Sequence, residues 1–323
     1  MGHSPLTNRS VLVTGATGSF GNAFVRRALD VGATKVVCLS RDELKQSKMR
    51  EAFADDRIRF IPADVKYDRE RIVLAMRGVD LVVHAAAMKQ IPTCEDHPYE
   101  SEDVNILGSR NVALASIDAG VERAVFLSSD KAASPNTQYG ACKFVAERGW
   151  IQSNVYGAGT KTKLCATRYG NVIASRGSVI PLFQKQARDG GPLTVTDKRM
   201  TRFFMSLADA VELVEIALSH SRGGEVYVPK ARACSILTVA DAVAPGVPYT
   251  ETGIRRGEKL HETLISVDES RDALEHTGFY TLEPDRTWEH LPDSDGTRLP
   301  EGFELRSDTV EQLSVTDLRR MIG

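Results

Sequence analysis

The chain has 323 residues, of which 42% are hydrophobic and 26% charged, and its formal net charge is −2. This composition excludes a disordered chain, a collagen and a coiled-coil rod, and the charge balance gives no reason to expect a nucleic-acid or membrane partner. Five cysteines without a C-x-x-C pair favour neither a disulfide framework nor a zinc site. We therefore expect a cytoplasmic protein with reduced thiols and no bound metal.

Up to residue 170, short β-branched segments alternate with helical patterns. The β-branched segments are apolar almost throughout, as strands buried on both faces of a sheet are. We expect strands at 11–14, 35–39, 58–61, 81–84, 124–127 and 163–167, and helices at about 20–31, 43–54, 69–77, 99–119 and 139–156. This alternation predicts an α/β fold with a Rossmann-like, doubly wound parallel sheet and right-handed crossovers.

The second half is less regular. Its patterns predict helices at 178–189, after a glycine-rich turn, and at 207–220 and 237–243, with a strand at 226–229. Residues 279–323 are polar, and we expect them to form short elements that cover the first domain. The predicted division is a first domain at 1–170 and a smaller, mainly substrate-binding region at 171–323. The boundary is soft, because chains of this class often cross back to the sheet.

A glycine-rich turn follows the first strand and precedes the first helix. Glycine permits a tight turn and a close approach of the backbone to a ligand. The helix N-terminus offers free N–H groups and a partial positive charge to a pyrophosphate. The spacing is G-x-x-G-x-x-G rather than G-x-G-x-x-G, but its place predicts a dinucleotide site. The residues proposed for it are Thr14, Gly15, Thr17, Gly18, Ser19, Phe20 and Gly21.

The end of the second strand bears on which dinucleotide is bound. An acidic residue there would bind the ribose 2′-hydroxyl of NAD, and an arginine would suit the 2′-phosphate of NADP. Ser40 and Arg41 come first, ahead of Asp42. The order favours NADP over NAD, so 1–170 is predicted to be an NADP-binding domain. Asp64 and Val65, after the third strand, are placed to meet the adenine, although a turn-forming aspartate is the alternative.

Tyr139 and Lys143 stand four residues apart at the start of a predicted helix. This spacing places both side chains on one face of the helix. A nearby ammonium group favours phenolate over phenol, so it can lower the pKa of the tyrosine. The phenolate could then remove a proton from a sugar hydroxyl while a hydride leaves the same carbon. We predict that both residues are catalytic.

The fifth predicted strand leads into Asp130 and Lys131. The carboxyl ends of parallel strands border the ligand crevice, so these side chains should meet the substrate. An adjacent acid and amine can carry out two proton transfers on neighbouring carbons. The alternative is a solvated charge pair in a surface turn.

Together these motifs resemble the extended short-chain dehydrogenase/reductase superfamily, and more closely its configuration-inverting UDP-N-acetylglucosamine 4,6-dehydratases. The matching stretches include TGATGSFG (14–21), SRDELKQ (40–46), HAAAMK (84–89), SSDKAASPNTQYGACK (128–143), RYGNVIASRGSVIPLF (168–183), TVTDKRMTRFFM (194–205) and GIRRGEKLHE (253–262). They extend from residue 11 to about 262. The Asp-Lys pair next to Tyr-x-x-x-Lys is the specific part of the resemblance.

The resemblance implies a redox-neutral cycle on a tightly held, recycled NADP. In it, Tyr139 takes the 4-hydroxyl proton as C4 is oxidised, Lys131 removes the C5 proton, and Asp130 protonates the departing 6-hydroxyl. Hydride returns to C6, and C5 is reprotonated on the opposite face. Ser129 replaces the usual threonine and keeps a hydroxyl that can bond the 4-hydroxyl of the sugar. Arg256 is a second departure, and it puts the choice of nucleotide sugar in doubt.

The resemblance also implies further contacts and an assembly. It adds cofactor contacts at Lys45, Ala85, Ala86, Ala87 and Tyr169, besides Tyr139 and Lys143. It implies substrate contacts at Lys89, Asn171, Val179, Thr194, Arg202, Arg255 and Glu258. The expected partners are a UDP-sugar substrate and further copies of the chain, packed through the helices near 99–119 and 139–156.

Two other functions stay open. One is a UDP-sugar epimerase acting at C4 or C5. Asp130 and Lys131 argue against simple 4-epimerisation, which needs no acid at C6. The other is a catalytically silent NADP-binding sensor, which would not need Tyr139, Lys143 and the Asp-Lys pair together.

Overall fold

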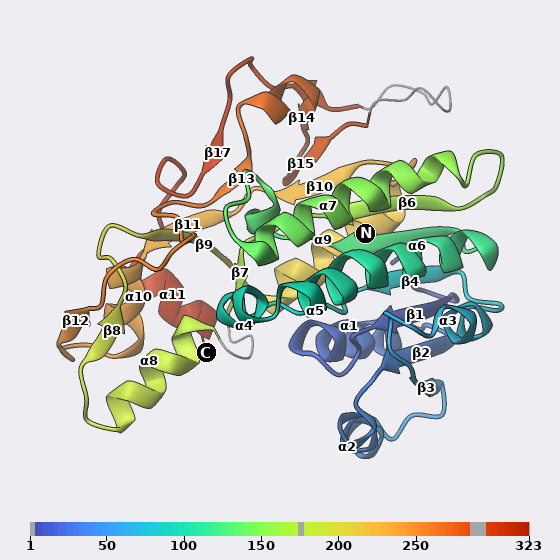
Figure 1. Cartoon of the computed structure of the whole chain (residues 1–323), viewed down its shortest axis with the longest axis horizontal. Coiled ribbons are helices and arrows are strands. Elements are labelled where there is room, and N and C mark those ends of the chain that lie inside the picture. Colours follow the sequence, from blue (N-terminus) through green and yellow to red (C-terminus); the bar gives the residue numbers. More distant parts are fainter. Residues whose placement is uncertain (1–3, 174–177, 285–294, 323) are drawn as a thin grey trace.

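A large, mostly parallel sheet lies between two layers of helices (Figure 1). The computed structural model describes residues 4–173, 178–284 and 295–322. Within them the sheet has ten strands in the order β16-β14-β15-β10-β6-β5-β4-β1-β2-β3. The parallel strands are β1 (Ser10–Thr14), β2 (Lys35–Ser40), β3 (Ile58–Pro62), β4 (Leu81–His84), β5 (Arg123–Leu127), β6 (Lys163–Thr167) and β10 (Val226–Pro229). The predicted fold class is confirmed.

Alternate residues of a strand point to opposite faces of the sheet and pack into different cores. This explains why the strands are apolar throughout. In β1, Leu12 faces one core, and Val11 and Val13 face the other. Helices on the Leu12 side are α3 (Arg69–Ala75), α6 (Gly108–Asp118) and α7 (Gln138–Gln152). Helices on the opposite side are α1 (Ser19–Asp30), α2 (Glu43–Phe53) and α9 (Leu207–His220). The two cores hold the sheet rigidly, so the carboxyl ends of its strands are fixed relative to one another.

One predicted helix, at 99–119, is interrupted. It consists of α5 (Pro98–Glu102), the π-helical turn η1 (Asp103–Leu107) and α6, and a short helix, α4 (Ile91–Asp96), precedes it. A π turn inserts one extra residue and often lies at a functional site. Hydrophobic periodicity cannot reveal it, because the apolar pattern continues on both sides. The helix predicted at 139–156 is α7 followed by the 3₁₀ turn η3 (Ser153–Val155).

The second half builds a separate small core beside the carboxyl ends of the main strands. Besides α9, the helices of that half are α8 (Val179–Arg188), α10 (Ile236–Val243) and α11 (Val315–Ile322), with the 3₁₀ turn η4 (Asp268–Asp272). Its short strands are β7 (Asn171–Val172), β8 (Leu193–Val195), β9 (Thr201–Met205), β11 (Arg232–Ser235), β12 (Tyr249–Glu251), β13 (Thr263–Ile265) and β17 (Leu305–Arg306). They pair as β11-β9-β7, β12-β8 and β13-β17. Apolar side chains of α8, α10, α11, β8 and β9 form this third core.

The chain returns to the main sheet after residue 170. β10 pairs with β6, and the antiparallel strands β15 (Phe279–Leu282), β14 (Ala273–Glu275) and β16 (Thr297–Arg298) extend the sheet beyond it. Residues 279–323 form short elements as predicted, but β15 and β16 are part of the sheet instead of a cover over the first domain, and α11 packs on α10. The division at residue 170 stays a prediction. The glycine-rich turn at 174–177 lies outside the described residues.

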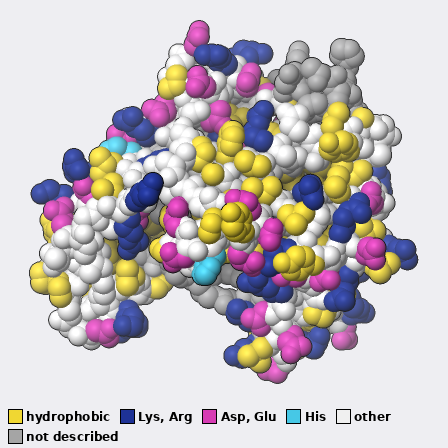
Figure 2. Space-filling model, viewed as in Figure 1, with side chains coloured by type: hydrophobic (Ala, Val, Ile, Leu, Met, Phe, Trp, Pro, Cys, Tyr) yellow, Lys and Arg dark blue, Asp and Glu magenta, His cyan; other side chains and the backbone are white. Residues whose placement is uncertain are grey.

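The surface mixes charges of both signs with scattered apolar groups (Figure 2). On the face shown, hydrophobic side chains lie between charged ones over α6 and α7. Tyr99, Phe144 and Val145 are among the exposed hydrophobic residues of this helical layer. None of the helices in the described part of the chain combines the length and apolar character needed to span a membrane.

Candidate functional site

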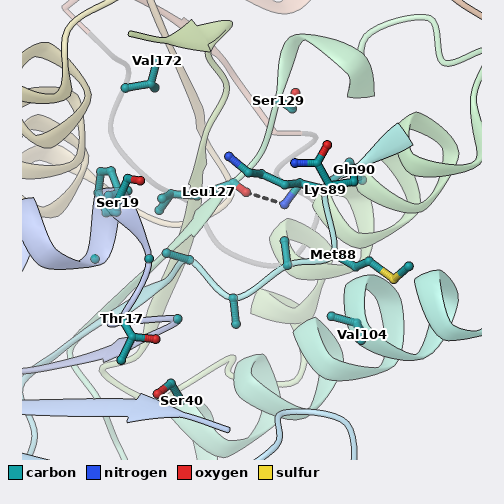
Figure 3. A pocket seen from close by; sticks show the side chains of 18 of the residues that line it. Thr17, Ser19, Ser40, Met88, Lys89, Gln90, Val104, Leu127, Ser129 and Val172 are labelled. Atoms are coloured by element: carbon teal, nitrogen blue, oxygen red, sulfur yellow. Dashed lines mark hydrogen bonds between the residues drawn. The ribbon is translucent and has the colours of Figure 1, made fainter. Parts of the chain in front are cut away.

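A cavity of about 570 Å³ opens at the carboxyl ends of the parallel strands (Figure 3). This is the edge at which parallel α/β sheets bind ligands. Nearly all of the residues proposed for the cofactor line it: Gly15, Thr17, Gly18, Ser19, Phe20, Gly21, Ser40, Arg41, Lys45, Asp64, Val65, Ala85, Ala86, Ala87, Tyr139, Lys143 and Tyr169. Asp130, Lys131 and Ser129 line the same cavity, so the structure brings the predicted cofactor and catalytic residues together.

The glycine-rich turn is shaped by close backbone contacts. Gly15 has φ +64°, and a Cβ there would lie 2.8 Å from the carbonyl oxygen of Ala85. A Cβ at Gly21 would lie 2.5 Å from the carbonyl oxygen of Ala16, so this glycine lets α1 pack onto the turn. Gly18 is the N-cap of α1 and supplies no side-chain cap. The absence of a capping side chain at the start of the helix, together with the close backbone packing of the turn, fits a pyrophosphate.

Thr14 lies beneath the cavity rather than on its wall. Its hydroxyl contacts His84 Nδ1 at 2.6 Å and accepts a hydrogen bond from the backbone N–H of Ala86 at 3.2 Å. Thr14 is fully buried. These contacts tie the end of β1 to the loop after β4. The residue therefore shapes the cofactor site from below and does not line the cavity.

Charged side chains surround the end of β2. Arg41 Nη1 lies 4.0 Å from an Asp64 carboxylate oxygen and 3.9 Å from one of Glu100, and its side chain is largely exposed. Asp42 caps α2 by accepting from the backbone N–H of Lys45, and its carboxylate also pairs with Lys45 Nζ at 2.8 Å. The Asp42 carboxylate is therefore already bound by Lys45 of α2. Arg41 extends from the wall of the cavity.

Asp130 and Lys131 form a buried ion pair. Lys131 Nζ lies 3.0 and 3.1 Å from the two carboxylate oxygens of Asp130, which also accepts a hydrogen bond from the Ser129 hydroxyl at 2.8 Å. Burial opposes the charged form of Lys131, but the carboxylates of Asp130 and Glu262 outweigh it and raise the pKa of the ammonium group. Lys131 therefore rests protonated beside a carboxylate.

Tyr139 and Lys143 enter the cavity from the first turns of α7. Thr137 caps the helix, and a Cβ at Gly140 would lie 2.5 Å from the carbonyl oxygen of Lys131. Gly140 thus lets the helix begin directly against the turn that carries the ion pair. The sequence shows a glycine directly after Tyr139, but it cannot show that this glycine packs against the carbonyl oxygen of Lys131.

The charge that favours the phenolate of Tyr139 comes from Lys131. Burial raises the pKa of Tyr139 to about 12, and the positive charge of Lys131 opposes that rise. Lys143 instead donates a hydrogen bond to the carbonyl oxygen of Leu127 at 2.5 Å, marked by the dashed line in Figure 3. Burial lowers the pKa of Lys143 to about 7. The charge that lowers the pKa of Tyr139 is therefore that of Lys131 and not, as expected, that of Lys143.

The predicted substrate contacts divide into two groups. Lys89 and Asn171 line the cavity. The other five, which do not line it, are Val179 at the start of α8, Thr194 on β8, Arg202 on β9, and Arg255 and Glu258 in the loop before β13. Arg255 and Glu258 pair with each other at 3.3 Å, and the Arg202 guanidinium donates to the carbonyl oxygens of residues 201, 259 and 260. Arg256 is exposed.

Two buried residues beside the site have no counterpart in the sequence-based prediction. Asn105, in the π turn, donates to the carbonyl oxygen of Met88 at 2.9 Å and accepts from its N–H at 3.0 Å. It thereby fixes the loop that carries Lys89. Glu262 lies 3.4 Å from Lys131 Nζ. Asn105 stands in none of the matching stretches, and Glu262 ends the stretch GIRRGEKLHE (253–262) but received no role there, so the tertiary contacts identify both.

The fold and the site together define an extended short-chain dehydrogenase/reductase. The chain belongs to the polysaccharide biosynthesis protein family, which matches residues 11–284. A UDP-N-acetylglucosamine 4,6-dehydratase (inverting) of Campylobacter jejuni is 41% identical over 278 residues, covering 85% of this chain and 83% of that protein. This confirms the resemblance drawn from the motifs.

Other similar proteins carry different names. A UDP-glucose 4-epimerase of Rickettsia akari is also 41% identical, over 288 residues, covering 86% of this chain and 84% of that protein. The crystal structure of Pen from Bacillus thuringiensis matches with a TM-score of 0.91 at 33% identity and covers 98% of each chain. A dTDP-glucose 4,6-dehydratase of Streptomyces venezuelae, solved with NAD, matches with a TM-score of 0.69 at 25% identity, covering 78% of this chain and 86% of that one.

Proposed function

We propose that this chain is a hydro-lyase that converts UDP-N-acetylglucosamine to the 4-keto-6-deoxy sugar with inversion at C5. The observation that carries this proposal is the buried Asp130–Lys131 pair in the same cavity as Tyr139. Loss of water across C5 and C6 needs an acid and a base next to the residue that deprotonates the 4-hydroxyl. The Campylobacter jejuni relative bears the name of this activity.

A nicotinamide dinucleotide is the cofactor that we propose for the cavity, and NADP in particular. The glycine turn offers the N–H groups that a pyrophosphate requires. Bound there, such a cofactor accepts and returns the hydride. Arg41, Asp42 and Lys45 all line the cavity near the end of β2, and the Asp42 carboxylate is paired with Lys45. Two cations and an engaged carboxylate favour a 2′-phosphate over a free 2′-hydroxyl.

The NADP preference predicts the effect of one substitution. Arg41→Glu should weaken NADP binding relative to NAD by about tenfold or more, since it places a negative charge beside the 2′-phosphate. Competition between the two dinucleotides for the purified protein measures the ratio. Lys48→Glu, an exposed change in α2 that does not line the cavity, is the matched control. An equal effect of both variants would contradict the assignment.

Tyr139 and Lys143 serve the first step. Tyr139 takes the proton of the 4-hydroxyl when C4 is oxidised, and it must be a phenolate at that moment. Lys131 supplies the nearby positive charge that favours the phenolate. Lys143 lies between the Leu127 carbonyl and the ring of Phe126, 3.9 Å from the ring centre. We assign it to holding the cofactor against this wall.

Asp130 and Lys131 serve the elimination, and they must first exchange a proton. Lys131 rests as an ammonium, whereas removal of the C5 proton needs the neutral amine. Transfer of one proton across the 3.0 Å contact gives a neutral amine and a carboxylic acid. The amine then takes the C5 proton, and the acid protonates the departing 6-hydroxyl. Loss of the ion pair is favoured when bound substrate excludes water, because a desolvated pair of charges is costly.

A 4-epimerase is the second candidate, since relatives of equal identity bear that name. The buried acid next to Lys131 favours the dehydratase, as exchange of the C4 configuration alone has no leaving group to protonate. The two activities differ in their products. Epimerisation conserves the mass of the sugar, and dehydration removes one water.

Incubation of the purified protein with UDP-N-acetylglucosamine in deuterated water tests the proposal. Proton NMR and mass spectrometry should show loss of one water, a new C6 methyl group, and an inverted, deuterated C5. A product of unchanged mass with an axial 4-hydroxyl would support the epimerase instead. No reaction, with a dinucleotide demonstrably bound, would contradict the substrate and leave the cofactor proposal standing.

A further inference from the structure

The segment 257–262, from the second half of the chain, lies against the turn that carries the Asp130–Lys131 pair. Gly257 has φ +81°, and a Cβ there would lie 2.8 Å from the carbonyl oxygen of Asn136, just before α7. Lys259 Nζ donates to the carbonyl oxygen of Ala133 at 2.7 Å. The segment therefore contacts both sides of the catalytic turn through polar or closely packed groups.

Glu262 ends this segment and reaches the catalytic amine. Its side chain is 95% buried, and one carboxylate oxygen lies 3.4 Å from Lys131 Nζ and 3.7 Å from Arg202 Nε. The other oxygen, 3.9 Å from Lys259 Nζ, has no hydrogen-bond partner among the described residues. Taking a carboxylate and the cations around it out of water is costly. We therefore expect the charge of Glu262 to have a role in the site. Arg202 also binds the backbone of the same segment, which fixes the carboxylate in place.

We propose that Glu262 is a positioning residue for Lys131. It holds the amine between two carboxylates, Asp130 from the first half of the chain and Glu262 from the second. The amine can then give its proton to Asp130 and still be held in place by Glu262. This inference rests on the proposed function, because it assigns Lys131 the proton transfer at C5.

The effect of Glu262 on the charge of Lys131 has a definite sign. The groups that face Lys131 are the Asp130 and Glu262 carboxylates, the Arg202 and Lys259 cations, and the hydroxyl groups of Ser129 and Tyr139. The two carboxylates favour the ammonium, and the two cations disfavour it. Replacement of Glu262 by glutamine removes one favourable charge and leaves both unfavourable ones. The pKa of Lys131 must then fall.

Two measurements separate this role from general damage to the fold. Deuterium exchange at C5, followed by NMR as a function of pH, reports on Lys131, and formation of the reduced nicotinamide on mixing with substrate reports on C4 oxidation. The rate of C5 exchange should rise with pH as Lys131 loses its proton and then level off. In Glu262→Gln it should level off at a pH about one unit or more below that of the parent protein. C4 oxidation should stay within about threefold, since Tyr139 and the cofactor turn do not contact Glu262.

Glu262→Asp and Glu269→Gln complete the design. Glu262→Asp keeps the charge on a shorter side chain, so it should slow C5 exchange and preserve the pH dependence of the parent. Glu269 is another carboxylate of the second half, which pairs with Arg168 at 2.8 Å instead of Lys131. Its glutamine variant should be less stable and should keep the parent pH dependence.

The outcomes are distinct. If the parent protein shows C4 oxidation without C5 exchange, the proposed dehydratase function fails. If the parent exchanges C5 and Glu262→Gln shows the same pH dependence and the same ratio of C5 exchange to C4 oxidation, the role of Glu262 is overturned. The same holds if Glu262→Asp shifts the pH dependence as far as Glu262→Gln, because the charge would then be irrelevant.

Discussion

The phenolic oxygen of Tyr139 is the group on which the proposed first step depends. Tyr139→Phe removes this oxygen alone and leaves the buried ring in place, so the fold should persist while turnover falls by about a thousandfold or more. Steady-state assays with the nucleotide sugar, together with the circular dichroism spectrum, check both parts. Normal turnover with unchanged cofactor content would contradict the assignment of this tyrosine.

His84 makes the stability of the folded chain depend on pH. The ring is fully buried, hydrogen-bonded to Thr14 and Ser109, and stacked on Trp150. Burial, with the nearby Lys143 charge, lowers the pKa of His84 to about 3 from an ordinary value near 6.5. The folded state therefore binds fewer protons than the unfolded state between these values, so stability is complete above about pH 6.5 and decreases as the pH falls below it.

Urea unfolding at a series of pH values measures this loss. His84→Asn, which keeps a polar side chain that cannot be protonated, should be less stable at neutral pH and show a shallower decrease on acidification. A parent protein whose free energy of unfolding is flat between pH 6.5 and 4.5 would contradict the buried neutral histidine.

At the scale of elements, Arg168 joins α7 to the second half of the chain. Its guanidinium is 1% exposed and pairs with Glu147 of α7 and with Glu269 of η4, and it donates to the Leu264 carbonyl oxygen at 3.0 Å. Arg168→Met should lower the free energy of unfolding by about 3–5 kcal/mol, because it leaves the Glu147 carboxylate buried without its cation. Denaturant unfolding measures the change.

The double variant Arg168→Met, Glu147→Gln tests the cause. It removes the unpaired charge and should recover a large part of the lost stability, whereas a simple loss of packing would not be recovered. Equal stability of the single and double variants would show that the buried charge is not responsible.

Sequence analysis located the strands of the first half well, and in the second half it located α8, α9, α10 and β10 but missed the other strands. The six parallel strands before residue 170 differ from their predicted bounds by at most one residue at either end, because strands buried on both faces are apolar along their whole length. β7, β8, β12 and β17 have two or three residues each, too short for any periodicity to appear. The π turn η1 was not predicted for a different reason, because its apolar pattern matches that of the helices beside it.

The same contrast holds for the candidate site. Its first half is made of local motifs, so the residues from Gly15 to Lys143 could be named from spacing and from the family resemblance that these motifs carry. Glu262 and Lys131 lie in two matching stretches that are far apart in the sequence, and neither stretch indicates that the two side chains meet. The guanidinium of Arg202 binds backbone carbonyl groups of the second half, although the resemblance implied a substrate contact. Roles that depend on tertiary contacts between the halves require the structure.

For the whole molecule, exposed apolar side chains on the α5–α7 layer favour a homo-oligomer. Tyr99 of α5 is 79% exposed, and Phe144 and Val145 of α7, the helix that also carries Tyr139 and Lys143, are 40% and 48% exposed. Burial of such residues against a second copy would be favourable by about 25 cal/mol per Å² of apolar surface. We predict that Phe144→Glu with Val145→Lys shifts the protein to a smaller species.

Sedimentation velocity of the parent and the double variant measures this change. Leu44 and Leu74, exposed apolar residues of α2 and α3, provide a control, since Leu44→Glu with Leu74→Lys should leave the assembly unchanged. A parent protein that sediments as a monomer would contradict the predicted oligomer.

The pairing of β10 with β6 has a consequence for biosynthesis. During translation the ribosome releases β6 about sixty residues before β10, so the nascent first half exposes an unpaired parallel edge with apolar faces. Such an edge can pair with other chains, and a chain ending near residue 170 would expose it permanently. A gene fragment encoding only the nucleotide-binding half should therefore yield inclusion bodies, whereas the full chain, in which β10 pairs with β6 and β15 pairs with β10, should yield recoverable protein.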